Sequence, residues 1–117
     1  MNFRDAVLDG RTNKALAGNP LAVVQDAEGL DTAQMQAIAR EFNLSETVFL
    51  LPARGPAHSA QVRIFTPARE LPFAGHPTVG TAIFLAMERF GEIKGEQNAV
   101  VVLEEEIGTV RCGVTLK

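Results

Sequence analysis

An apolar stretch that begins at Thr78 constrains the fold of this chain more than any other segment. It reads TVGTAIFLAMERF, and charged side chains occur only at Glu88 and Arg89, near its end. A surface helix carries a polar stripe along one side, whereas a helix that is apolar on all sides is buried. The sequence therefore predicts a sheet that curls around one buried central helix.

The start of this helix is marked by the residues GHP at positions 75 to 77. Proline suits the first position of a helix, where no N–H is needed and its fixed φ already fits. His76 is then expected at or next to the N-cap, and Gly75 allows the backbone to approach a neighbour closely. Free N–H groups and the helix dipole favour an anion there, and His76 could donate a hydrogen bond or exchange a proton near neutral pH. The alternative is that His76 merely caps a turn.

The other elements are short and mostly extended. Apolar residues recur at helical spacing in residues 31 to 42, and Asp31 with Gln34 gives a capping-box-like start. The segments with strand patterns are 2 to 8, 21 to 25, 46 to 51, 61 to 66, 99 to 103 and 109 to 116, the last two joined as a hairpin. Strands outnumber helices and do not alternate with them. This pattern is typical of an α+β fold with a mostly antiparallel sheet, here in one domain over residues 1 to 117.

Composition restricts the class of function. The chain has 117 residues, 46% of them hydrophobic, and a formal net charge of -3, which is typical of one soluble domain. The acidic balance gives no reason to expect nucleic acid, and no apolar run reaches membrane-spanning length. Residues 1 to 10 do not resemble a secretory signal, and the single cysteine, Cys112, cannot form an internal disulfide. The expected compartment is the cytoplasm.

A second candidate site lies in NLSETVF, residues 43 to 49. Glu46 directly precedes a strongly apolar strand, so its carboxylate is expected to be partly desolvated, which suits proton transfer. Ser45 beside it could hydrogen-bond this carboxylate or a ligand. The alternative is a solvated glutamate at a turn between a helix and a strand.

The remaining titratable residues are interpreted as structural. Glu41 and the three glutamates at 104 to 106 are expected to be solvated, the latter as a charged hairpin turn. His58 has no partner at metal-ligand spacing and is expected at the surface. Cys112 lies on the apolar face of a strand and is expected to be a small core residue. No metal cluster and no phosphate-binding glycine loop is predicted.

Three longer stretches occur in a characteristic order along most of the chain. They are AGNPLAVV (17 to 24), MQAIAREFNLSETVF (35 to 49) and RIFTPARELPFAGHPTVGTA (63 to 82). Together they resemble the phenazine-biosynthesis PhzF-like family, which shares the diaminopimelate-epimerase fold. The resemblance implies a two-lobed protein, each lobe a sheet curled around a central helix, with the active site between the lobes.

The resemblance also implies an activity and the residues that perform it. Family members are cofactor-free isomerases or epimerase-like enzymes that act on small carboxylic acids. In the phenazine enzyme the glutamate of a SET motif shuttles a proton on an anthranilate-type acid, and that glutamate corresponds to Glu46. The Gly-His pair at the start of the central helix corresponds to Gly75 and His76. An asparagine that faces the ligand in the wider fold corresponds to Asn19.

The resemblance is incomplete in two respects, and the residues exclude one mechanism. Family chains have two lobes and are expected to be about twice as long as this chain. This chain ends on what is expected to be the last strand of the first lobe. The stretch LDGRTNKAL before AGNP departs from the family's usual loop.

Epimerases of this fold that use two thiols carry a cysteine at the start of each central helix. Residues 73 to 76 contain none, so that chemistry is excluded.

Two functions stay open. The first is the N-terminal half of a PhzF-like isomerase without metal or cofactor, in which Glu46 transfers the proton. Gly75, His76, Asn19 and Ser45 would then bind a small carboxylic acid. One lobe offers half a cleft, so a second lobe must come in trans, from a separate C-terminal-lobe chain or from a second copy in a homodimer. The second function is a non-catalytic dimerising or ligand-binding remnant of a truncated or split gene, with self-association covering its open inner face.

Overall fold

The fold was obtained as a computed structural model that describes residues 4–8, 21–90 and 96–116. Its elements, in chain order, are β1 (Arg4–Leu8), β2 (Leu21–Gln25), the short 3-10 helix η3 (Ala27–Gly29), α1 (Thr32–Phe42), β3 (Thr47–Leu51), β4 (Ala60–Phe65), β5 (Glu70–Leu71), α2 (Gly75–Phe90), β6 (Gln97–Glu105) and β7 (Gly108–Leu116). Asn19 and most of LDGRTNKAL lie outside the described residues.

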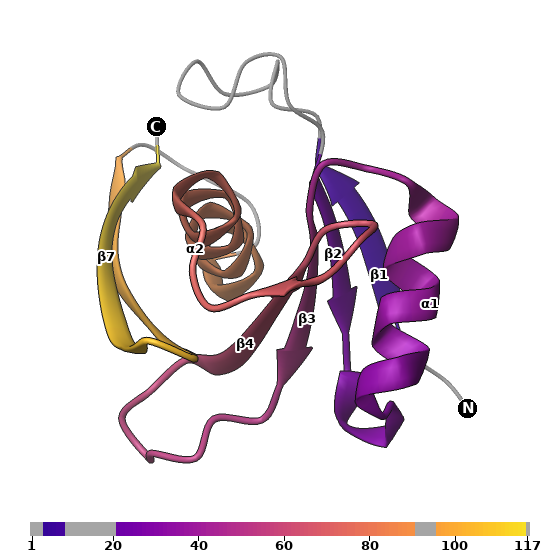
Figure 1. The fold of residues 1–117 in the computed structure, drawn as a ribbon. Helices are drawn as coiled ribbons and strands as arrows, with labels where there is room; N and C mark the ends of the chain where they lie inside the picture. The colour runs from indigo at the N-terminus through magenta and orange to yellow at the C-terminus, as the bar shows by residue number, and fades with distance from the viewer. Residues whose placement is uncertain (1–3, 9–20, 91–95, 117) are drawn as a thin grey trace.

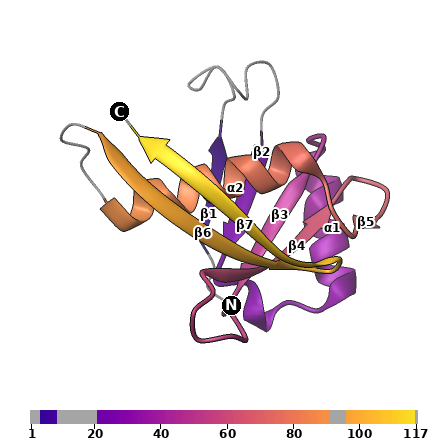
Figure 2. The same cartoon turned by 90° about the vertical axis from the view of Figure 1, so that its left-hand side faces the viewer.

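The described strands form one mixed sheet in the order β1-β2-β3-β4-β6-β7, with β5 paired to β4. The β1/β2, β3/β4, β4/β5 and β6/β7 pairs are antiparallel, and only β2/β3 and β4/β6 are parallel. The sheet curls around α2, with the β6–β7 hairpin on one side of the helix and β2 to β4 on the other (Figures 1 and 2). The predicted α+β fold with a mostly antiparallel sheet around a central helix is confirmed.

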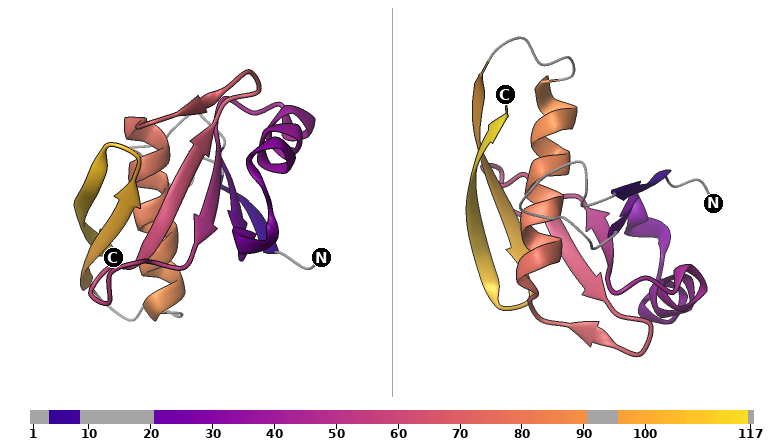
Figure 3. Two further views of the ribbon diagram at one scale, coloured as in Figure 1. Left: turned by 60° about the horizontal axis from the view of Figure 1, so that its bottom comes forward. Right: turned by 90° about the horizontal axis from the view of Figure 1, so that it is seen from above.

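The two helices lie on opposite faces of the sheet, and each face has its own core (Figure 3). Strand β3 contributes to both cores because its side chains alternate between the faces. Val48 and Leu50 pack in the cluster that contains α2 residues, whereas Phe49 packs in the cluster with α1. In this second cluster the rings of Phe49 and Phe65 meet edge to face, with centroids 5.4 Å apart. This double burial explains why β3 is apolar at almost every position.

Helix α2 packs against the inner face of the sheet, and part of its surface stays exposed. Small residues, among them Thr81, Ala82 and Ala86, are buried against the sheet. On the other side Val79 is 42% exposed and Met87 is 50% exposed. The predicted buried central helix is confirmed, and the described residues leave only part of its surface exposed.

No helix among the described residues is long and apolar enough to cross a membrane.

Candidate functional site

Glu46 is placed by the way helix α1 begins and ends. The predicted capping box is present: Asp31 accepts a hydrogen bond from the Gln34 backbone N–H at 2.7 Å, and the Gln34 side chain accepts one from the Asp31 N–H at 2.9 Å. Asn43 ends the helix in the left-handed conformation, with φ at 53°. The chain then turns into β3, which leaves Ser45 exposed and Glu46 half-buried just before the first strand residue.

The GHP residues are placed by a tight turn that follows β4. The Thr66 N–H donates to the carbonyl oxygen of Arg69 at 2.8 Å, and the Thr66 hydroxyl oxygen accepts from the Arg69 N–H at 3.0 Å. The turn sends the chain back along β4 as β5, and α2 follows at Gly75.

The helix starts earlier than expected. Thr78 donates its backbone N–H to the carbonyl of Ala74 at 3.1 Å, so Ala74 immediately precedes the helix and His76 is its second residue. His76 is half-buried and Gly75 is exposed. Among the described residues, no heavy atom lies within 4 Å of a Cβ built on Gly75, so none of them makes the close approach to the backbone that was expected there.

Strand register brings the SET and GHP motifs to the same end of the sheet. Thr47, which follows Glu46, lies opposite Phe65, and Phe65 lies opposite Glu70 of β5, five residues before α2. Figure 2 shows the start of α2 and the entry to β3 at this end. Strand β2 also starts here, because Ala22 is opposite Thr47. Ser45, Glu46, Gly75 and His76 therefore lie at one end of the sheet, and their roles stay predictions.

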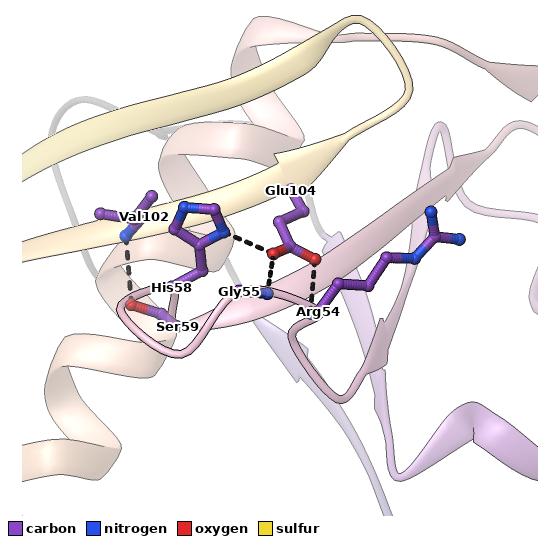
Figure 4. A network of polar contacts seen from close by, with 6 residues as sticks. All are labelled: Arg54, Gly55, His58, Ser59, Val102 and Glu104. Atoms are coloured by element: carbon purple, nitrogen blue, oxygen red, sulfur yellow. Dashed lines mark hydrogen bonds and ion pairs between the residues drawn. The ribbon is translucent and has the colours of Figure 1, made fainter.

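A polar network that the sequence did not predict holds the loop between β3 and β4 (Figure 4). The carboxylate of Glu104 accepts hydrogen bonds from the backbone N–H groups of Arg54 and Gly55, both at 2.8 Å. The same carboxylate contacts Nδ1 of His58. The expectations of a solvated Glu104 and a surface His58 are wrong, since both side chains are half-buried and in contact.

Tight packing within this loop explains its glycine. A Cβ on Gly55 would lie 2.6 Å from Nδ1 of the His58 ring, closer than such atoms approach. A second pair of hydrogen bonds joins Ser59 to Val102 of β6: the Ser59 N–H donates to the Val102 carbonyl at 2.8 Å, and the Val102 N–H donates to the Ser59 hydroxyl at 3.1 Å. The loop is thus fastened to β6 at two points.

The hydrogen bonds to Glu104 lower its pKa to about 2 from the usual 4.5, with the Arg54 N–H contributing most, followed by His58 and the Gly55 N–H. A carboxyl with a lowered pKa in the folded state contributes stability above its unfolded pKa, and this contribution is lost as the pH falls toward about 2.

We expect Glu104→Gln to lower the urea midpoint of unfolding near neutral pH, because an amide NH2 would face backbone donors. The difference from the unsubstituted protein should shrink as the pH falls from about 4.5. Glu106→Gln, a change at an exposed position of the same turn, is the matched control and should leave the midpoint unchanged. Equal midpoints for the unsubstituted protein and Glu104→Gln at neutral pH would contradict a role for the network in stability.

A cavity of about 620 Å³ lies beside this network, where β4 and β5 separate from the β6–β7 hairpin. Its charged side chains are largely paired with one another. Arg63 makes a two-point contact with Glu70, at 2.8 Å from Nε and 2.7 Å from a terminal nitrogen, and Glu104 contacts His58. Neither Glu46 nor His76 lines this cavity. Among the described residues, no group of three His, Cys, Asp or Glu side chains could hold a metal ion.

Comparison with known proteins identifies the family. Residues 8–117 match the family described as phenazine biosynthesis-like protein. An uncharacterised isomerase of Mesorhizobium japonicum is 64% identical over 117 residues, covering 98% of this chain and 37% of the relative. The trans-2,3-dihydro-3-hydroxyanthranilate isomerase of Pseudomonas fluorescens is 47% identical over 104 residues, covering 89% of this chain and 34% of the relative.

A solved structure, described as a predicted epimerase from Pseudomonas aeruginosa, superimposes with a TM-score of 0.74 at 40% identity, covering 94% of this chain and 37% of the other. The chain thus spans about a third of the length of the relatives that it matches. The prediction that family chains are about twice as long as this chain is therefore wrong. The family match and these similarities agree with the resemblance carried by the SET and GHP motifs. The chain therefore belongs to the phenazine biosynthesis-like protein family.

Proposed function

We propose that this chain supplies the N-terminal lobe of a cofactor-independent isomerase or epimerase that works in the cytoplasm on a small carboxylic acid. The observation that carries the proposal is the placement of the SET and GHP motifs at one end of the sheet in a member of this family. Glu46 takes a proton from a carbon of the substrate and returns it to a carbon, so that no net proton is gained or lost.

The start of α2 binds the carboxylate of the substrate. The first N–H groups of a helix have no partner within the helix, and the dipole favours negative charge at this end. Gly75 suits this role because it is exposed, and no described residue would contact a Cβ added to it. His76 adds a side chain next to it that can donate a hydrogen bond. Ser45 and Asn19 complete the proposed set of substrate contacts.

A second lobe faces this end and completes the cleft. It comes from a separate C-terminal-lobe chain or from a second copy in a homodimer. The partly open apolar side of α2, with Val79 and Met87, supports the view that this lobe associates with further protein. The same observation favours the second candidate function, a non-catalytic module that dimerises or binds a ligand through the remaining anion site.

Native mass, measured together with the intact mass of every chain present, separates these functions when it is combined with a turnover assay. The natural first substrate is trans-2,3-dihydro-3-hydroxyanthranilate, which the Pseudomonas fluorescens relative is named for, followed by other small unsaturated or amino acids. The enzyme proposal predicts a complex with a different chain, or a homodimer, that converts one of these acids. A monomer without turnover would contradict it, and an inactive dimer would support the non-catalytic module.

A further inference from the structure

Glu105, at the end of β6, is a buried carboxyl group that faces the central helix. Val101 and Leu103 point into the core that contains α2, and the alternation along the strand directs Glu105 to the same side. The residue is only 8% exposed. The expectation that this glutamate is solvated is therefore wrong. One of its oxygens, Oε1, is buried and has no hydrogen-bond partner in the part of the chain that the structure describes, and the other contacts Thr78 in α2.

The hydrogen bonds of Thr78 restrict the protonation state of this carboxyl. The Thr78 hydroxyl oxygen lies 2.8 Å from the carbonyl oxygen of Ala74 and 2.8 Å from Oε2 of Glu105. A hydroxyl has one hydrogen, and an ionised carboxylate can only accept. With Glu105 ionised, one of the two contacts would join two acceptors with no hydrogen between them.

A proton on Glu105 satisfies both contacts. The protonated Oε2 donates to the Thr78 hydroxyl oxygen, and that hydroxyl donates its own hydrogen to the carbonyl of Ala74. The unpartnered Oε1 is then the carbonyl oxygen of a neutral acid, which costs less to bury than half of a carboxylate. The geometry therefore fits a chain of two hydrogen bonds from β6 to the residue that precedes α2.

The surroundings favour the protonated form. Burial raises the pKa of Glu105, and the Thr78 hydrogen bond opposes this with a smaller effect. On β7, burial raises the pKa of the Cys112 thiol, and the negative charge that Glu105 carries once ionised raises it further. The other ionisable side chains around the adjacent cavity are Arg54, His58, Arg63, Glu70, Glu104 and Glu106. The nearest cation on β4, Arg63, is already engaged by Glu70.

We propose that Glu105 is a positioning residue: its protonated carboxyl acts through Thr78 to fix the first turn of α2, which carries Gly75 and His76. Loss of the proton turns the Thr78 hydroxyl toward the carboxylate and removes the side-chain hydrogen bond from Ala74. That this turn binds substrate rests on the proposed function. The hydrogen-bond chain itself does not.

The sign of the pH dependence follows from the raised pKa. A carboxyl with a raised pKa in the folded state contributes stability below its unfolded pKa and loses it as the pH rises through the folded value. This is opposite to the behaviour of Glu104. Glu105→Gln stays neutral and can still donate an N–H to Thr78, so it should keep the first turn of α2 in the same state at every pH.

A carbon-13 NMR titration of the glutamate carboxyls, with Glu105 assigned by its absence in Glu105→Gln, tests the proposal without an activity assay. We expect the Glu105 carboxyl to titrate above 4.5, and the backbone amides of Gly75, His76 and Thr78 to shift with the same midpoint. In Glu105→Gln these amides should no longer shift at that midpoint. The control Glu106→Gln should leave the titration of Glu105 and the amide response unchanged.

Thr78→Val separates the hydrogen-bond chain from a general effect of charge. This variant keeps the buried carboxyl but removes the hydroxyl, so the carboxyl should still titrate while the specific coupling to the turn is lost. A Glu105 midpoint at or below 4.5, or amides of Gly75, His76 and Thr78 that do not shift with that midpoint, would overturn the proposal. If Glu105→Gln does not fold, the Glu105 carboxyl is assigned by its through-bond connection to its own backbone amide, and the titration of the unsubstituted protein and of Thr78→Val still decides the question. Failure of every turnover assay would leave these outcomes untouched.

Discussion

Glu46→Gln is expected to lower kcat by roughly a hundredfold to ten-thousandfold in an active preparation, the usual contribution of a positioned acid or base. Glutamine has the size of glutamate but cannot take up and return a proton. Glu46 lies at the entry to β3, half-buried, where a neutral replacement can occupy the same position. The binding of the substrate should change little, because the carboxylate of the substrate is proposed to bind at the start of α2. Steady-state turnover and ligand titration measure the two effects separately.

Glu41→Gln is the matched control for this substitution. Glu41 is an exposed residue of α1, five positions before Glu46, and it lies outside the proposed site. Its replacement should leave kcat unchanged. Turnover by Glu46→Gln at the level of Glu41→Gln would remove Glu46 from the proton-transfer step.

Phe49→Ala is expected to lower the free energy of unfolding by about 3–5 kcal/mol, the typical cost of removing a buried phenylalanine ring. Phe49 of β3 is fully buried on the face of the sheet that packs against α1, and its ring meets that of Phe65 edge to face. The substitution leaves a cavity on the α1 side of the sheet and removes this ring contact. Because a single domain of this size has a small margin of stability, the variant should be close to unfolding at room temperature. Urea denaturation followed by circular dichroism measures the loss.

Phe73→Ala provides the control for ring removal. Phe73 lies in the segment before α2 and is 42% exposed. Its replacement should change the free energy of unfolding by less than about 1 kcal/mol, since no buried cavity is created. Equal losses for Phe49→Ala and Phe73→Ala would contradict the assignment of Phe49 to a packed core.

The parts of the fold that depend on local sequence could be predicted. The capping box at Asp31 involves residues three apart, and the apolar character of β3 follows from burial on both faces. The parallel pairing of β4 with β6, which places Ala60 opposite Leu103, could not be predicted, because it joins residues far apart in the chain. The burial of Glu105 and the contact between Glu104 and His58 both depend on this part of the sheet. Three consecutive glutamates give no local sign that Glu104 is half-buried and Glu105 is buried.

The candidate site was predictable from its motifs but not from its geometry. Glu46 and His76 belong to the SET and GHP motifs, which resemble those of the family. Strand register then places both residues at one end of the sheet. The exact start of α2 was not predictable, since proline at position 77 suits the first turn as well as the first residue. The participation of Glu105 through Thr78 had no signal in the sequence, because the two residues are 27 positions apart.

The proposed proton transfer by Glu46 on a carboxylic acid is tested by the rate at which solvent deuterium enters the product in heavy water. The active protein is compared with Glu46→Gln. Because Glu46 is half-buried rather than sealed from solvent, its proton should exchange, and deuterium should appear in the product. We predict that Glu46→Gln reduces this rate to that of the solution without enzyme. Deuterium entering at the same rate with and without the Glu46 carboxyl would contradict the claim.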